Sequence, residues 1–193
     1  MAQLRLFIAI ELPSGILSAL NQVQHDLQRE PALARLRWVR PEGIHLTLKF
    51  LGETPAERQP AIEAAITRAV TGVAPFEVHL GKLGRFGSRQ SPRVVWIDVG
   101  GDSETLARLQ LQVERETAPL GYPSEGRAFS PHLTLARVPP ERARDVAEPL
   151  EDAIARTTVP AAAMQVTEVS LMKSDLQRGG AVYTRLFAAQ LSH

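Results

Sequence analysis

Two histidines and two threonines recur at matching positions in this chain of 193 residues. The segment His-Leu-Thr-Leu occurs at residues 45–48 and again at residues 132–135. An imidazole can take up or release a proton near neutral pH, so two imidazoles can serve as base and acid in one reaction. Threonine hydroxyls can donate hydrogen bonds to the phosphate oxygens on which charge gathers in a transition state. This set therefore suits the hydrolysis of a phosphodiester, in which water loses a proton and the leaving alkoxide gains one.

Both motifs are expected to lie on strands, because apolar and β-branched residues alternate around them. Residues i and i+2 of a strand point to the same side, and their neighbours point to the other. His45 and Thr47 therefore share one face, and His132 and Thr134 share the corresponding face of the second strand. We predict that the motif leucines enter the core while the His and Thr side chains face a cleft or solvent.

The chain also contains an internal repeat. His45 and His132 are separated by 87 residues, and a strand, a helix, a motif strand and a helix follow in the same order in each half. We predict an α+β fold with two lobes related by a pseudo-two-fold axis. Each lobe has a mainly antiparallel sheet with helices on its outer face, and a central cleft lies between them. The expected organisation is one domain over 1–193, with repeats at about 4–87 and 92–174 whose lobes exchange terminal strands.

Helices are predicted where apolar residues recur at helical spacing, over about 14–30, 54–70, 103–118 and 141–155. Strands are predicted over 4–12, 36–40, 44–52, 76–86, 93–99, 131–138, 164–173 and 181–191. The expected N-terminal caps are Ser14, Thr54 and either Asp102 or Ser103. Gly81 and Gly84 indicate a bulge or bend within their strand. Turns are predicted at 41–43, 100–101 and 179–180.

Composition excludes several classes of protein. The chain has no cysteine, which rules out disulfides, thiolate metal sites and a cysteine nucleophile. No stretch approaches the roughly 18 apolar residues of a membrane span, and the first residues read as a strand rather than a signal peptide. We therefore expect a cytoplasmic protein without a membrane partner. The net charge of +1 argues against wrapping a long nucleic acid but allows a local basic cleft.

The chain resembles the two-histidine (2H) phosphoesterase superfamily, and most of all its RNA 2′,3′-cyclic phosphodiesterase branch, also called 2′–5′ RNA ligases. That family has two His-x-Thr-x motifs on a bilobal α+β fold. The segments that carry the resemblance span nearly the whole chain: 5–12, Arg-Trp-Val at 37–39, IHLTLKFLG at 44–52, PRVVW at 92–96 and FSPHLTLAR at 129–137.

The resemblance implies a role for each motif residue. His45 is the proton donor to the leaving oxygen, and His132 is the base that activates water. Thr47 and Thr134 hold the phosphate. The residues alone leave the two histidine roles interchangeable, because the repeat makes the motifs equivalent.

Arg137 resembles a phosphate-contacting arginine of the family. Strict strand alternation places it on the leucine face, so it needs a twist or a strand end to reach the cleft. Its counterpart in the first half is Phe50, which carries no charge.

The resemblance implies hydrolysis of RNA 2′,3′-cyclic phosphate ends to 2′-phosphates by paired histidines, without a metal or any cofactor, and possible 2′–5′ ligation in reverse. The expected partners are RNA with such an end, tRNA fragments among them, or a nucleoside 2′,3′-cyclic phosphate, bound by a monomer. Two alternatives stay open. One is a phosphodiesterase for a small cyclic nucleotide such as ADP-ribose 1″,2″-cyclic phosphate, and the other is a non-catalytic module that binds RNA ends.

Other candidate residues are weaker. A single histidine is more often structural than catalytic, and we interpret His25, His79 and His193 in that way. The aromatic residues that can stack on a base are Trp38, Phe50, Phe86 and Tyr183. The basic segment 82–93 predicts either an RNA path or a solvated loop.

Overall fold

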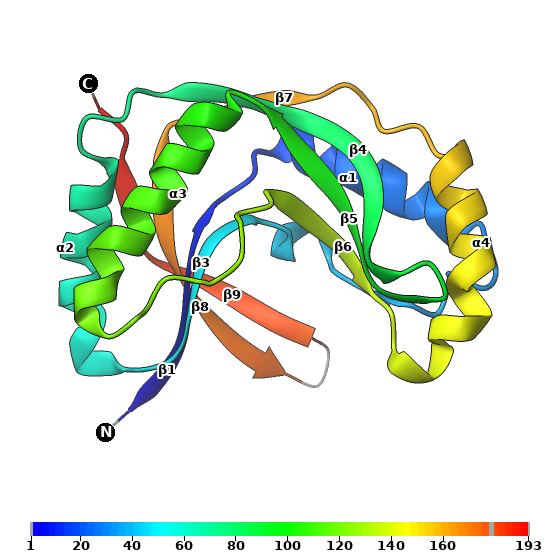
Figure 1. Cartoon of the computed structure of the whole chain (residues 1–193), viewed down its shortest axis with the longest axis horizontal. Coiled ribbons are helices and arrows are strands. Elements are labelled where there is room, and N and C mark those ends of the chain that lie inside the picture. The colour runs from blue at the N-terminus through cyan, green and yellow to red at the C-terminus, as the bar shows by residue number, and fades with distance from the viewer. Residues whose placement is uncertain (1, 178–179, 193) are drawn as a thin grey trace.

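The computed structural model describes residues 2–177 and 180–192 and consists of two antiparallel sheets with helices packed against them (Figure 1). The strands are β1 (Gln3–Ile10), β2 (Arg37–Trp38), β3 (Leu46–Pro55), β4 (Phe76–Ser88), β5 (Ser91–Gly101), β6 (His132–Arg137), β7 (Ala163–Val166), β8 (Glu168–Gln177) and β9 (Gly180–Gln190). Sheet A has the order β3-β1-β8-β9, and sheet B has the order β2-β6-β5-β4-β7.

Four α-helices of the described residues lie in pairs on the two sheets. They are α1 (Ser14–Gln28), α2 (Gln59–Val70), α3 (Ser103–Thr117) and α4 (Ala143–Arg156). Helices α2 and α3 pack together against sheet A, whereas α1 and α4 cover sheet B (Figure 1). The predicted α+β fold, with two mainly antiparallel sheets, is confirmed.

Each sheet is built from both halves of the chain. Strand β4 belongs to the first half but pairs with β5 in sheet B, and β8 belongs to the second half but pairs with β1 in sheet A. The helices cross over in the same way. Helix α1 follows β1 of sheet A yet bonds to β6, and α3 follows β5 of sheet B yet packs on α2 and β3.

The motif leucines lie in the core, as their alternation predicts. Leu46, Leu48, Leu133 and Leu135 are all less than 4% exposed. The helices bury apolar residues at spacings of three and four, which places one stripe of each helix against a sheet. No helix among the residues described here is long and apolar enough to cross a membrane.

The predicted helix caps are only partly correct. Asp102 caps α3, since its side chain accepts a hydrogen bond from the backbone N–H of Thr105 at 3.0 Å. Ser14 is instead the first residue of α1. Thr54 lies inside β3, where its buried hydroxyl accepts a hydrogen bond from Tyr122, so it is not available to cap α2.

Two strand predictions also need correction. The expected strand at 164–173 divides into β7 and β8, which belong to different sheets. The expected strand at 36–40 is reduced to the two residues of β2. The bend near Gly81 is confirmed as a register shift between Leu80 and Leu83. Of the expected turn at 179–180, Gly179 lies outside the described residues, and β9 begins at Gly180.

Candidate active site

A cleft of about 700 Å³ is lined by both motifs. His45 lies directly before β3, and Thr47 follows it on the same side of that strand. His132 and Thr134 enter the same cleft from β6. The structure therefore brings together the four residues that the repeat singled out. The cleft is completed by residues of β1, β3, β4, β6, β8 and β9, among them Phe7, Phe86, Arg137 and Tyr183.

A β-bulge interrupts β3 just after its His-x-Thr motif. Thr47 pairs with Ala9 of β1, but Ile8 pairs with Lys49, so Leu48 is the extra residue. The bulge turns two consecutive side chains, Leu48 and Lys49, toward the core, where they are 3% and 2% exposed.

The second motif strand carries a bulge at the equivalent position. Thr134 of β6 pairs with Trp96, whereas Ala136 pairs with Val95, so Leu135 is the extra residue. Leu135 and Ala136 are both fully buried. The two bulges are themselves 87 residues apart, like the histidines.

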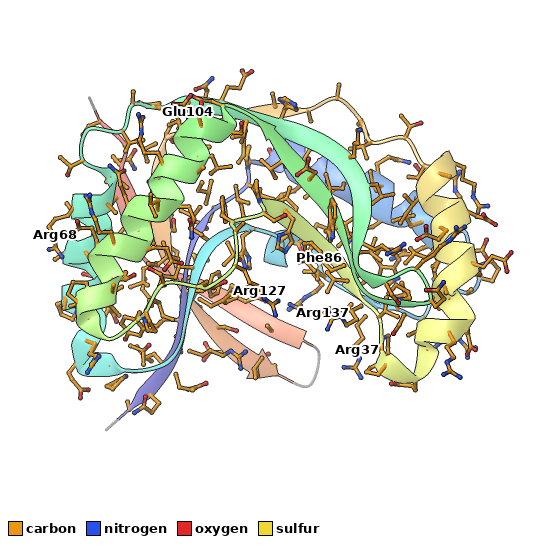
Figure 2. All side chains as sticks on the ribbon, in the orientation of Figure 1. Arg37, Arg68, Phe86, Glu104, Arg127 and Arg137 are labelled. Atoms are coloured by element: carbon orange, nitrogen blue, oxygen red, sulfur yellow. The ribbon has the colours of Figure 1, made fainter. Side chains whose placement is uncertain are left out.

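The bulges decide which residue follows each motif into the cleft. Phe50 and Arg137, the residues just past the buried pairs, both line it. Strict alternation predicted the leucine face for Arg137, and this is wrong because the bulge reverses the alternation. Figure 2 shows Arg137 near Phe86 at the end of β6.

Two glutamines bind the backbone at the bulges. Gln24 of α1 donates from Nε2 to the carbonyl of Leu135 at 3.0 Å and to that of Val39 at 2.7 Å. Gln110 of α3 donates to the carbonyl of Leu48 at 3.4 Å. Each bulge carbonyl is thus bonded by a helix that follows a strand of the other sheet. Sequence reasoning missed this pair, although a Gln on the inner stripe of each helix was a visible signal.

His132 is held in one tautomer. Its Nδ1 lies 2.7 Å from the carbonyl oxygen of Ser130, and a carbonyl can only accept, so Nδ1 carries the hydrogen. The neutral ring therefore has an unprotonated Nε2, which can act as a base. The rings of Phe86 and His132 pack at right angles with their centroids 4.8 Å apart, and Phe86 in turn contacts Trp96.

His45 has a more enclosed environment. Its ring stacks on Phe7 at 4.5 Å between centroids, and Tyr183 packs edge-on at 4.9 Å. Burial lowers the pKa of His45 to about 4, although a hydrogen bond to the backbone of Gly43 acts in the opposite direction. Phe7 was not among the predicted site residues, but alternation along β1 places it opposite the core residues Leu6 and Ile8.

The arrangement of this cleft matches a known family. A family model described as the 2′-5′ RNA ligase superfamily matches residues 17–178. The chain belongs to the 2′-5′ RNA ligase superfamily. The family expected from the two motifs is thereby confirmed.

Relatives in this superfamily align over most of the chain. The RNA 2′,3′-cyclic phosphodiesterase of Methanothermobacter thermautotrophicus is 34% identical over 94% of this chain and 96% of its own length. The protein of the same name from Bacillus subtilis is 32% identical over 68% of this chain and 69% of its own. Among solved structures, Escherichia coli LigT in its apo form has a TM-score of 0.77 at 28% identity, with both chains fully covered. A Thermus thermophilus protein has a TM-score of 0.76 at 29% identity, with 97% of each chain covered.

The other predicted candidates lie away from the cleft of this superfamily member. His25 is exposed on α1, and His79 borders a small apolar cavity. His193 falls outside the described residues. In the basic segment, Arg85 and Arg89 pair with Glu151 of α4 rather than lining the cleft.

Three of the four candidate stacking residues, Phe50, Phe86 and Tyr183, line the cleft, and Trp38 lines an adjoining groove. Within residues 2–177 and 180–192, no group of three or more His, Asp or Glu side chains is arranged to hold a metal ion.

Proposed function

We propose that this protein hydrolyses RNA 2′,3′-cyclic phosphate ends to 2′-phosphates by paired histidine acid–base catalysis without a metal. The observation that carries the proposal is the meeting of His45, Thr47, His132 and Thr134 in one cleft. The relatives named RNA 2′,3′-cyclic phosphodiesterase support this choice of substrate. Because every residue of the set comes from one chain, we propose that the monomer is active.

The two histidines divide the proton transfers. His132 takes a proton from water through Nε2, and the water oxygen attacks phosphorus. The bond from phosphorus to O3′ breaks on the opposite side, and His45 gives its proton to O3′. The hydroxyls of Thr47 and Thr134 donate hydrogen bonds to the non-bridging oxygens, where charge accumulates. Water and the cyclic ester are converted to a 2′-phosphomonoester and a free 3′-hydroxyl.

The same geometry allows ligation with a different nucleophile. A 5′-hydroxyl can take the place of water, and its oxygen then forms a 2′–5′ phosphodiester as O3′ leaves. The strain of the cyclic ester supplies the driving force, so ATP is not needed. Hydrolysis dominates because water is in great excess over RNA 5′-hydroxyls.

Aromatic rings in the cleft can seat the nucleoside. Phe50 is 62% exposed, which is unusual for so large an apolar side chain, and it lies beside the motif residues. Stacking of a base on this ring would cover it and would not depend strongly on which base is present. A structure of E. coli LigT complexed with 3′-AMP supports a nucleotide as the ligand of this fold.

Identification of the product tests the proposed reaction. With 2′,3′-cyclic AMP or an oligonucleotide ending in the cyclic phosphate, we expect complete conversion to the 2′-phosphate in excess EDTA. ³¹P NMR or chromatography against both phosphate isomers distinguishes the products. An enzyme pretreated with EDTA and then supplied with Mn²⁺ or Zn²⁺ is the control.

Each contrary outcome points to a different error. A 3′-phosphate product would refute the substrate orientation and the assignment of His45 as the acid. Activity lost in EDTA and restored by added metal would refute metal independence. Absence of turnover with both substrates would refute the phosphodiesterase assignment and favour a module that only binds.

Protonation of His45 should depend on bound phosphate. Its pKa of about 4 in the free protein means that the ring is neutral at pH 7, whereas a proton donor must be charged. An anion within about 4–6 Å favours the imidazolium and raises the pKa. We therefore expect NMR titration of the His45 ring to show a midpoint near pH 4 in the free protein. The midpoint should lie clearly higher when 2′-AMP is bound.

Adenosine serves as the matched control, because it has the same base and ribose but no phosphate. Its binding should leave the His45 midpoint unchanged or lower it further through burial. If 2′-AMP also leaves the midpoint near pH 4, His45 cannot be the proton donor at neutral pH, and the two histidine roles must be reversed.

A further inference from the structure

Two arginines face each other at the edge of sheet B. In the pairing of β2 with β6, Arg37 lies directly opposite Arg137, and both are exposed. Figure 2 shows the two side chains next to each other, extending away from the sheet. Like charges directly opposite on antiparallel strands are destabilising. Within residues 2–177 and 180–192 neither arginine forms an ion pair with a carboxylate, so an external anion can offset the repulsion.

The arginine pair adjoins a second cavity. A side groove of about 550 Å³ runs beside the cleft, and Arg137 lines both. Trp38 and Tyr183 form apolar walls of this groove. Its charged side chains are Arg40, Arg137 and Glu42, so the guanidinium groups outnumber the carboxylate. Arg37 is not among the lining residues but lies directly opposite Arg137 on the neighbouring strand.

This feature breaks the pseudo-symmetry of the two lobes. Strand β2 lies outside β6 in sheet B, but no described strand lies outside β3 in sheet A. Phe50, at the position equivalent to Arg137, therefore faces no cross-strand cation. The cross-strand arginine pair is therefore present at only one end of the cleft, which Arg5 of β1 also lines, and the pair gives a nucleic-acid strand one preferred direction.

We infer that Arg37 and Arg137 form a second phosphate site, which binds the internucleotide phosphate next to the reacting end of an RNA strand. The inference rests on the proposed function, since it places a cyclic phosphate between the two motifs. Guanidinium groups bind phosphate oxygens through paired N–H donors. The aromatic walls of the groove can stack on the adjacent base. The site would make the enzyme prefer an RNA end over a mononucleotide.

Comparison of two substrates tests this site. For Arg37→Gln, we expect KM for a tetranucleotide ending in a 2′,3′-cyclic phosphate to rise about 3- to 10-fold at low salt. Its kcat, and both constants for 2′,3′-cyclic AMP, should not change, because a mononucleotide has no second phosphate. The slope of log KM against log salt should fall by about 0.7, as expected for one lost contact with a single strand.

Two further variants act as controls. Arg144→Gln removes an exposed positive charge from α4, which packs on the same sheet, and should change neither KM nor kcat for either substrate. Arg37→Lys keeps the charge and should retain most of the preference for the tetranucleotide. If Arg37→Gln raises KM equally for both substrates, or leaves KM for the tetranucleotide unchanged, the second phosphate site is refuted.

Binding measurements separate this inference from the proposed reaction. If the unmodified enzyme turns over neither substrate, the proposed function has failed, and dissociation constants decide the second site. Tighter binding of a dinucleotide ending in a 2′-phosphate than of 2′-AMP, lost in Arg37→Gln, supports the site. Equal affinity for the two ligands overturns it.

Discussion

Replacing either His45 or His132 with alanine is expected to lower kcat by about 10²–10⁴-fold, the usual loss when a positioned acid or base is removed. Both rings line the cleft rather than the core, so the variants should remain folded. Rates with 2′,3′-cyclic AMP at a fixed pH, together with circular dichroism spectra, measure the two effects separately.

His25→Ala provides the matched control. His25 is exposed on α1 and does not line the cleft, so its loss should leave kcat within a factor of about two. The assignment of the motif histidines is wrong if His25→Ala is as damaging as either of them. It is also wrong if one motif histidine can be removed without loss.

Lys49→Met is expected to lower the free energy of unfolding by about 3–5 kcal/mol. Lys49 is only 2% exposed and forms an ion pair with Glu114 of α3, which is 4% exposed. Its Nζ also donates to the carbonyl of Pro123 at 2.9 Å, in the segment that leads to the second motif. Removing one partner leaves a buried carboxylate without its counter-charge, which is among the most destabilising single changes.

A double variant distinguishes this cause from simple loss of packing. Lys49→Met combined with Glu114→Leu removes both charges and should recover much of the lost stability, because a buried ion pair is often replaceable by apolar residues. Urea unfolding of the unmodified protein, of Lys49→Met, of Glu114→Leu and of the double variant gives the coupling energy between the two side chains. A cost below about 1 kcal/mol for Lys49→Met alone would contradict the expected burial of an unpaired charge.

The periodic parts of the fold were predictable from the sequence. Alternation located both motif strands and assigned their leucines to the core, because a strand buried on one face must alternate. Helical spacing located the four α-helices, and Asp102 is a correct cap. The spacing of 87 residues also predicted two equivalent strands whose motifs face a common cleft.

The features that were not predictable depend on contacts between distant segments. A bulge leaves no signal in alternation alone: strict alternation puts Arg137 on the core face, and the same rule would put Lys49 on the face of His45 and Thr47. The structure reverses both, and the partner of Lys49, Glu114, lies 65 residues further along the chain. Threonine is a residue type that often caps helices, but Thr54 lies inside a strand, where its hydroxyl accepts a hydrogen bond from the Tyr122 hydroxyl.

Each sheet combines strands from both halves of the chain, and this has a consequence for biosynthesis. Leu6 of β1 pairs with Lys173 of β8, so sheet A cannot be completed until nearly the whole chain has left the ribosome. Pairing over such distances is slow, and the unpaired strands stay open to other chains in the meantime. Neither half of the chain contains a complete sheet. The first half alone would keep the pairing of β1 with β3 but would lack β8, the second partner of β1, and β4 would lack its neighbour β5. The edges of β1 and β4 that face later strands therefore stay exposed in the nascent protein until those strands emerge.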